Sequence, residues 1–230
     1  MIDFHFFGKN CDIDKDLINR EHLNLKLAEL NIVPTTTLFL NQVHGNQVVI
    51  IDSPQKIYGE QGLPKADGLV SNQKNLALAI VTADCGPVIL YDEENSIIGI
   101  CHAGWRGAKA GIIENTVLAM KDLGAVNINA VIGPMIQQYS YQVSGDFYDD
   151  FINEKSSNAK FFKSSKDIAK WQFSLSGYIH EKIEKLGINE IENLEIDTYT
   201  NESKFYSYRR KKHSNDDSVH GRNISIVINR

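Results

Sequence analysis

The chain has 230 residues, is 42% hydrophobic and carries a formal net charge of −5. A chain of this length folds as one large domain or as two closely joined lobes. The acidic balance provides no overall basic field for nucleic acid or for an anionic membrane surface, so we expect neither partner. The longest apolar runs, such as LALAIV, are too short to span a bilayer.

The cysteine content and the N-terminal sequence both indicate an intracellular protein. Three cysteines at unequal spacing, Cys11, Cys85 and Cys101, do not form a disulfide framework and are expected to be reduced. The N-terminal sequence MIDFHFFGKNCDIDKD lacks the basic region and the long apolar core of a signal peptide. We therefore expect a cytoplasmic location.

Short apolar runs and helical spacings predict an α/β fold. The predicted strands lie at residues 47–51, 76–81, 88–91, 97–101, 130–132 and 224–228. Several are continuously apolar, which is typical of strands covered on both faces. Amphipathic spacing predicts helices at residues 108–123, 146–153 and 174–186, with a further candidate at 14–30. The polar stretch KKHSNDD at residues 211–217 is expected to be a mobile loop.

A predicted hairpin brings Cys85 and His102 together. The short turn around residues 93–95 makes the two strands antiparallel, with paired residue numbers that sum to about 188 or 189. Residue 86 or 87 then lies opposite His102, at the end of the hairpin where Cys85 also lies. Cys101 precedes His102 in the strand, so we expect its side chain to face the opposite side, in the core.

The Cys85–His102 pair has three chemical interpretations. The histidine can lower the thiol pKa and create a nucleophile. The two side chains can instead be part of a metal site that needs further ligands. The third interpretation is a buried cysteine beside a hydrogen-bonded histidine. His44, in the loop before the strand at 47–51, is a candidate third ligand, although its spacing alone is more typical of a polar loop residue.

Charged residues near these positions are candidates for substrate binding. Arg106 is either an anion ligand or a solvated surface residue. The segment FYSYRR at residues 205–210 and the later Arg222 can stack a base and hold phosphate, but a strand with exposed arginines explains them equally well. Asp67, in ADG, is interpreted as a turn former or a proton-transfer group, and Asp84 places an acid beside Cys85.

Seven short motifs occur in an order that resembles one known family. They are QVHG at 42–45, ADG at 66–68, TADC at 82–85, HAGWRG at 102–107, IGP at 132–134, FYSYRR at 205–210 and GR at 221–222. As a set they closely resemble the YfiH-type, or laccase-domain, proteins. The most specific part is HAGWRG with the upstream ADC. The first 40 residues lack the Gly-Gly-Val-Ser loop and the Ser-Leu-Asn-Leu-Gly segment that are usual in the family.

The resemblance implies a single α/β domain over residues 1–230, with mixed sheets and a relation to cysteine-hydrolase-like toxin domains. It implies a metal centre, usually zinc, held by His44, Cys85 and His102, which are also the expected catalytic residues. Three protein ligands leave a fourth zinc position open, as in catalytic sites.

The resemblance also implies phosphorolysis of purine nucleosides, adenosine above all, with inosine and methylthioadenosine as further substrates and adenosine deamination as a side activity. The expected small-molecule partners are therefore a purine nucleoside and phosphate. Candidates for substrate binding and proton transfer are Asp67, Asp84, Arg106, Arg209, Arg210 and Arg222. The oligomeric state is not specified by the sequence.

Three alternative functions remain open on these residues. Cys85 and His102 fit an amide hydrolase that edits peptidoglycan precursors, an activity to which bacterial relatives have been linked. A copper-dependent polyphenol oxidase would use His44, Cys85 and His102 with Met135 as an axial ligand, although a multicopper enzyme needs about ten histidine ligands and this chain has seven histidines. A metal-dependent binding module without turnover is the third alternative.

Overall fold

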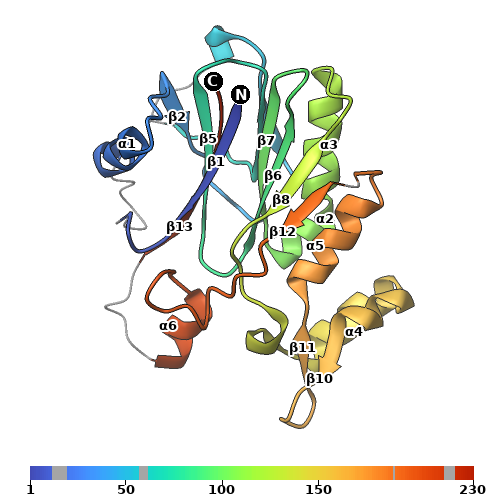
Figure 1. Cartoon of the computed structure of the whole chain (residues 1–230). Helices are drawn as coiled ribbons and strands as arrows, with labels where there is room; N and C mark the ends of the chain where they lie inside the picture. The colour runs from blue at the N-terminus through green and yellow to red at the C-terminus, as the bar shows by residue number, and fades with distance from the viewer. Residues whose placement is uncertain (12–19, 57–61, 189, 215–220) are drawn as a thin grey trace.

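Two β-sheets that face each other form the centre of the protein (Figure 1). The computed structural model describes residues 1–11, 20–56, 62–188, 190–214 and 221–230. Within these ranges, the first sheet has the strand order β1 (Ile2–Phe7), β13 (Asn223–Asn229), β5 (Leu76–Thr82) and β2 (Thr36–Leu38). The second has the order β12 (Ile191–Asn193), β8 (Asn129–Ile132), β6 (Gly86–Asp92), β7 (Ile97–Ala103), β4 (Gly68–Ser71) and β3 (Val48–Ile51). The two sheets mix parallel and antiparallel pairs, which confirms the predicted α/β class.

Helices cover the outer faces of both sheets, as Figure 1 shows. The first sheet packs against α1 (Arg20–Glu29), and the second against α3 (Ile112–Asp122) and α5 (Leu175–Glu184). In β5, Leu78 and Ile80 face the space between the sheets, whereas Ala77 and Ala79 face α1. Both faces of such a strand are therefore buried, which explains the continuous apolar runs in the sequence.

A third, smaller sheet lies near the lower end of the molecule in Figure 1. It consists of β10 (Phe162–Ser164), β11 (Lys170–Phe173) and β9 (Gln142–Ser144), and it lies beside α4 (Gly145–Glu154). The short 3₁₀ helices η1 (Pro54–Lys56), η2 (Gln138–Ser140) and η3 (Ser156–Phe161) and the helices α2 (Trp105–Ala110) and α6 (Tyr208–Ser214) complete the described elements.

The predicted strands at 47–51, 76–81, 88–91, 97–101, 130–132 and 224–228 and the helices at 146–153 and 174–186 are confirmed with small shifts of their ends. The hairpin register is also confirmed, because Pro87 pairs with His102 and Gly86 with Ala103. Of the helix expected at 14–30, residues 14–19 lie outside the described residues, and α1 covers most of the remainder.

Three predictions about secondary structure are wrong. Residues 108–123 form two helices rather than one, because Gly111 takes a left-handed φ of 94° between α2 and α3. Residues 205–210 are not a strand, since α6 begins at Tyr208. Residues 211–214 belong to α6 instead of a loop, whereas 215–217 lie outside the described residues.

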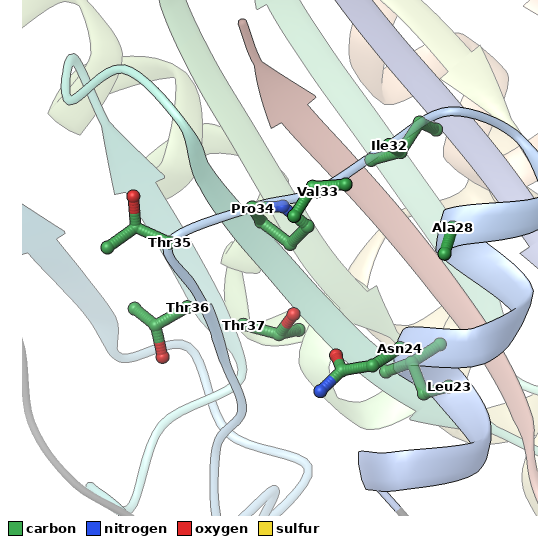
Figure 2. A pocket seen from close by; sticks show the side chains of 9 residues that line it. All are labelled: Leu23, Asn24, Ala28, Ile32, Val33, Pro34, Thr35, Thr36 and Thr37. Carbon is green, nitrogen blue, oxygen red and sulfur yellow. The ribbon is translucent and has the colours of Figure 1, made fainter.

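A cavity of about 320 Å³ opens between α1 and the segment that leads into β2 (Figure 2). Leu23 and Asn24 line it from the helix, and Val33, Pro34 and the three threonines at 35–37 line it from the segment. None of its lining residues belongs to the loops at 41–45, 82–86 or 102–107. In the described part of the chain, no helix has the length and apolar character needed to cross a membrane.

Candidate metal centre

Three loops meet where β6 begins and β7 ends, and each contributes one predicted ligand. Cys85 directly precedes β6, His102 lies near the end of β7, and His44 lies in the loop before β3. One donor atom from each residue lies within 4.8 Å of the other two. The two imidazole rings have centroids 4.6 Å apart, and the Cys85 Sγ is 3.9 Å from the His44 Nε2. The structure thus brings together all three residues that the sequence selected.

The chemistry of these donors fits a transition-metal ion. Two imidazole nitrogens and one thiolate form a ligand set that zinc accepts, and a fourth position stays open for water or substrate. Among the described residues, His44, Cys85 and His102 are the single group of three such side chains close enough to share an ion. His44 is exposed, Cys85 is partly exposed and His102 is buried, so the group is open to solvent on one side.

Asp67 positions both histidines through hydrogen bonds, one to the His102 ring and the others to the backbone of the loop that carries His44. Its carboxylate is fully buried and lies 2.8 Å from the His102 Nδ1, which leaves the Nε2 of that ring for a metal. The same carboxylate accepts hydrogen bonds from the backbone amides of Val43, His44 and Gly45 at 3.2, 3.0 and 2.7 Å. Burial opposes ionisation, but His102 and these amides outweigh it and lower the pKa of Asp67. Asp67 therefore acts as an ionised acceptor that fixes both ligands.

The loop that carries His44 is held in an unusual conformation. His44 has a left-handed φ of 60°, which an L-residue adopts rarely and at an energetic cost. Gln42 attaches the same loop to β5, since its side-chain amide donates to the carbonyl of Val81 and accepts from the amide of Val81, both at 2.8 Å. Sequence reasoning missed this role of Gln42, although the residue begins the QVHG motif.

Gly104 provides the space that the ligands need. A Cβ atom at this position would lie 2.9 Å from the Cys85 Sγ and 3.3 Å from the His44 Cδ2. The small residue after His102 and Ala103 therefore lets the side chains of Cys85 and His44 approach the backbone closely.

The ionised forms of Cys85 and His102 stabilise each other. Burial raises the pKa of the Cys85 thiol, but the charge of His102 and hydrogen bonds from both histidines lower it to about 6. Burial lowers the pKa of His102, but the Cys85 charge and the Asp67 hydrogen bond raise it to about 9. Without a metal, the pair is a thiolate and an imidazolium at neutral pH, and the sulfur is already deprotonated for metal binding.

Cys101 behaves as predicted for a core residue. Its side chain is fully buried on the α3 side of the sheet, and burial raises its pKa to about 12. The thiol next in sequence to a metal-ligand candidate is thus protonated and packed away from the cluster.

Asp84 is engaged on both carboxylate oxygens. Its Oδ1 accepts from the Thr198 hydroxyl at 2.7 Å, and its Oδ2 accepts from the Ser207 hydroxyl at 2.9 Å and the Arg209 amide at 2.6 Å. The residue is nearly buried and has a left-handed φ of 85°. The sequence located Asp84 beside Cys85, but it held no signal for partners more than a hundred residues away.

The four candidate arginines occupy different surroundings. Arg210 donates to the carbonyls of Thr198, Tyr199 and Phe205, so its guanidinium holds the backbone. Arg222 donates to the carbonyl of the preceding Gly221.

Arg106 is exposed and lies 4.8 Å over the Trp105 ring. Arg209 is half-buried, donates to the Gln142 carbonyl at 2.7 Å and lies 5.2 Å over the ring of Tyr141.

Tyr141 was not selected from the sequence, yet it lies beside this group. Burial and the charges of Cys85 and Asp84 raise the pKa of its hydroxyl, whereas Arg209 and Arg106 act in the opposite direction. All four charged side chains therefore act on one phenol. Because Tyr141 also packs against Phe147 and Phe173, its ring is fixed in place.

Comparisons with known proteins identify a family model and several named relatives. The family model described as "Multi-copper polyphenol oxidoreductase laccase" matches residues 11–230. A protein named purine nucleoside phosphorylase from Rickettsia prowazekii is 42% identical over 219 residues, which cover 91% of this chain and 89% of the relative. Purine nucleoside phosphorylase YfiH of Escherichia coli is 31% identical over 208 residues, which cover 89% of this chain and 80% of that protein.

The fold is likewise shared with solved structures. The crystal structure of the YfiH protein of Bacillus licheniformis superposes with a TM-score of 0.78 at 27% identity, over 91% of this chain and 80% of that one. The family match at residues 11–230 includes all three loops that carry the candidate ligands. The chain belongs to the laccase-domain family, in which its relatives from Rickettsia prowazekii and Escherichia coli are named purine nucleoside phosphorylases.

Proposed function

We propose that this protein is a zinc-dependent purine nucleoside phosphorylase that prefers adenosine, also accepts inosine and methylthioadenosine, and deaminates adenosine as a side activity. The observation that carries the proposal is the His44–Cys85–His102 cluster with Asp67 bound to the Nδ1 of His102. A histidine fixed in this way is typical of a metal ligand. The names of the relatives supply the reaction class.

The donor set favours zinc over a multicopper arrangement. His44, Cys85 and His102 would hold the ion, and the bound ion would supply Lewis acidity at its open position. A multicopper oxidase requires on the order of ten histidine ligands, whereas the described part of the chain contains one cluster with two. The protein residues around the cluster must then bind and orient the nucleoside and the phosphate.

Phosphorolysis forms a bond between a phosphate oxygen and the anomeric carbon of the sugar while the bond from that carbon to the purine nitrogen breaks. The purine leaves with the bonding electrons and takes up one proton, which dihydrogen phosphate or solvent supplies. Arg106 and Arg209 are the arginines proposed to hold the phosphate, since guanidinium groups bind phosphate oxygens in pairs. Their support is that both act, together with Cys85, on the hydroxyl of Tyr141. Asp67 and Asp84, with occupied oxygens, shape the site through their hydrogen bonds.

Product analysis tests this proposal directly. Purified protein with adenosine and phosphate should release adenine and ribose 1-phosphate in equal amounts, with a smaller yield of inosine. Omission of phosphate should stop adenine release but leave the deamination. The Cys85→Ala variant, purified in parallel, should lose both activities and thereby exclude a contaminating host phosphorylase. Adenine release that persists in this variant would contradict the proposal.

The lowered pKa of Cys85 favours one second candidate, a cysteine hydrolase in which Cys85 attacks an amide of a peptidoglycan precursor and His102 acts as base. Chelation distinguishes the two functions. A hydrolase keeps its activity after metal removal and loses it on alkylation of Cys85, whereas the phosphorylase loses its activity in both treatments. We propose the cytoplasm as the location of either enzyme, since Cys85 and Cys101 are thiols outside any disulfide.

A further inference from the structure

Asp84 connects the Cys85 loop to a distant part of the chain. Its three hydrogen-bond donors, Thr198, Ser207 and the Arg209 amide, are 114, 123 and 125 residues away in sequence. The carbonyl of Asp84 also accepts from the amide of Ile136, in the loop after β8. The segment at 198–209 is thus attached to the residue that immediately precedes the thiolate ligand.

The same hydrogen bonds set the start of α6. The hydroxyl of Ser207 donates to Asp84 and accepts from the amide of Arg210 at 3.1 Å, which caps the first turn of the helix. With the Arg209 amide also bound to Asp84, the backbone position of Arg209 is fixed relative to Cys85. Its side chain is then fixed by the Gln142 carbonyl and the Tyr141 ring.

We infer that Asp84 is a positioning residue that docks the 198–209 segment on the Cys85 loop and so places Arg209 to bind the phosphate substrate. This inference rests on the proposed function. The left-handed φ of Asp84 belongs to the same arrangement, because a conformation that L-residues rarely adopt persists where surrounding contacts enforce it. Both carboxylate oxygens of Asp84 already accept hydrogen bonds from the protein, so in this inference the residue acts through Arg209.

The backbone of Asp84 allows a clean test. Glycine accepts a φ of 85° without strain, so Asp84→Gly removes the carboxylate while the turn is kept. Asparagine also tolerates this conformation, and its amide can accept from Ser207 and Arg209 while it donates to the Thr198 hydroxyl. Asp84→Asn should therefore rescue most of what Asp84→Gly loses. Asn75→Gly, a second left-handed position at the opposite end of β5, is the matched control.

The measurements are calorimetric titration with inorganic phosphate, metal content, and separate KM values for phosphate and adenosine. We expect Asp84→Gly to weaken phosphate binding and to raise the phosphate KM by about tenfold or more, the effect of losing hydrogen bonds to a charged group. The adenosine KM and the metal content should change by less than about twofold. Ser207→Ala should show a smaller loss of the same kind, and Arg209→Ala a loss at least as large as Asp84→Gly.

Several results would overturn the inference. Unchanged phosphate binding in Asp84→Gly or in Arg209→Ala is one, and equal losses for phosphate and adenosine are another, since those indicate general loosening. An Asp84→Asn variant as impaired as Asp84→Gly also contradicts it. If Asp84→Gly fails to fold, Ser207→Ala decides. Wild-type protein that binds phosphate but releases no adenine would contradict the proposed function. The phosphate titrations of the variants would still test the positioning role of Asp84.

Discussion

Asp67 and Asp84 both bury a carboxylate beside the His44–Cys85–His102 cluster, but they receive hydrogen bonds from different parts of the chain. The partners of Asp67 are His102 and the 43–45 loop, which carry the two imidazoles. The partners of the Asp84 carboxylate all lie between residues 198 and 209, in a segment that contributes none of the three candidate ligands. The contrast separates the two proposed roles: Asp67 would set the geometry of the metal ligands, and Asp84 would set the position of Arg209 for phosphate.

The largest effect is expected from the loss of Cys85, the sulfur donor of the His44–Cys85–His102 cluster. Cys85→Ala removes the sulfur donor between the two carboxylates, so zinc affinity should fall by more than the roughly 10- to 100-fold typical of an outer partner, and nucleoside turnover should be lost. Competition with a chromogenic chelator measures the affinity.

Cys101→Ala is the matched control for this change. Its thiol is buried on the opposite face of β7, so zinc affinity should be unchanged and stability should fall by about 1 kcal/mol, the cost of a small core truncation. A similar loss of zinc in both variants would mean that Cys85 is not a ligand.

Asp67→Asn should produce the next largest effect and distinguishes the two carboxylates. The amide weakens the bond to the His102 Nδ1 and the hold on the 43–45 loop, so zinc affinity should fall by about 10- to 100-fold. Asp84→Asn should change it far less. Zinc affinities that fall equally in both variants would contradict the proposed difference between the roles of Asp67 and Asp84.

Asp92→Asn controls for the loss of a buried carboxylate as such. Asp92 is fully buried and accepts the amides of Asn95, Val126 and Asn127 at the other end of β6. This variant should lower the unfolding temperature but leave zinc affinity at the wild-type value.

The sequence predicted the His44–Cys85–His102 cluster far better than the contacts between Asp84 and residues 198–209. Hairpin register follows from turn length, so the meeting of Cys85 and His102 could be deduced, as could the opposite orientation of Cys101. His44 could be selected only through the family motif. The partners of Asp84 depend on how residues 198–209 return to the β6 end, and local spacing contains no information about contacts at that separation.

Two secondary-structure errors have the same kind of cause. The periodicity of residues 108–123 is helical on both sides of Gly111, so a change of helix direction at one glycine leaves the apolar spacing intact. At 205–210, three aromatic residues and two arginines are compatible with a strand, but the Ser207 cap and the Asp84 carboxylate start a helix there. In both cases a backbone conformation or a hydrogen bond that residue periodicity does not encode decided the structure.

Gly104→Ala should displace Cys85 and His44 together, and it should lower zinc affinity less than Asp67→Asn does. The added methyl meets the Cys85 Sγ at 2.9 Å and the His44 Cδ2 at 3.3 Å, so these side chains must shift by tenths of an ångström. We expect zinc affinity to fall by about threefold to tenfold, less than an outer-partner loss. Gly45→Ala is the control, because its new methyl would make only ordinary contacts at 3.6 Å. Equal zinc affinities in the two variants would show that Gly104 has no such role.

The smallest expected effect concerns the pH dependence of the free energy of unfolding. It tests whether folding transfers a proton from the Cys85 thiol to the His102 imidazole. The raised pKa of His102 contributes stability that is complete below about pH 6.5 and is lost as the pH rises through about 9. The lowered pKa of Cys85 contributes stability that is complete above about pH 9 and is lost as the pH falls through about 6. The two slopes have opposite signs between pH 6.5 and 9, because folding moves one proton from sulfur to imidazole without net uptake. Urea unfolding of the zinc-free protein should therefore give a nearly constant free energy in this window. In Cys85→Ala the thiolate no longer raises the pKa of His102, so only the part of the histidine contribution that Asp67 supports remains to be lost as the pH rises. A wild-type free energy that falls steadily between pH 6.5 and 9 would mean that Cys85 is not a thiolate, and the sulfur would then have to lose its proton when zinc binds.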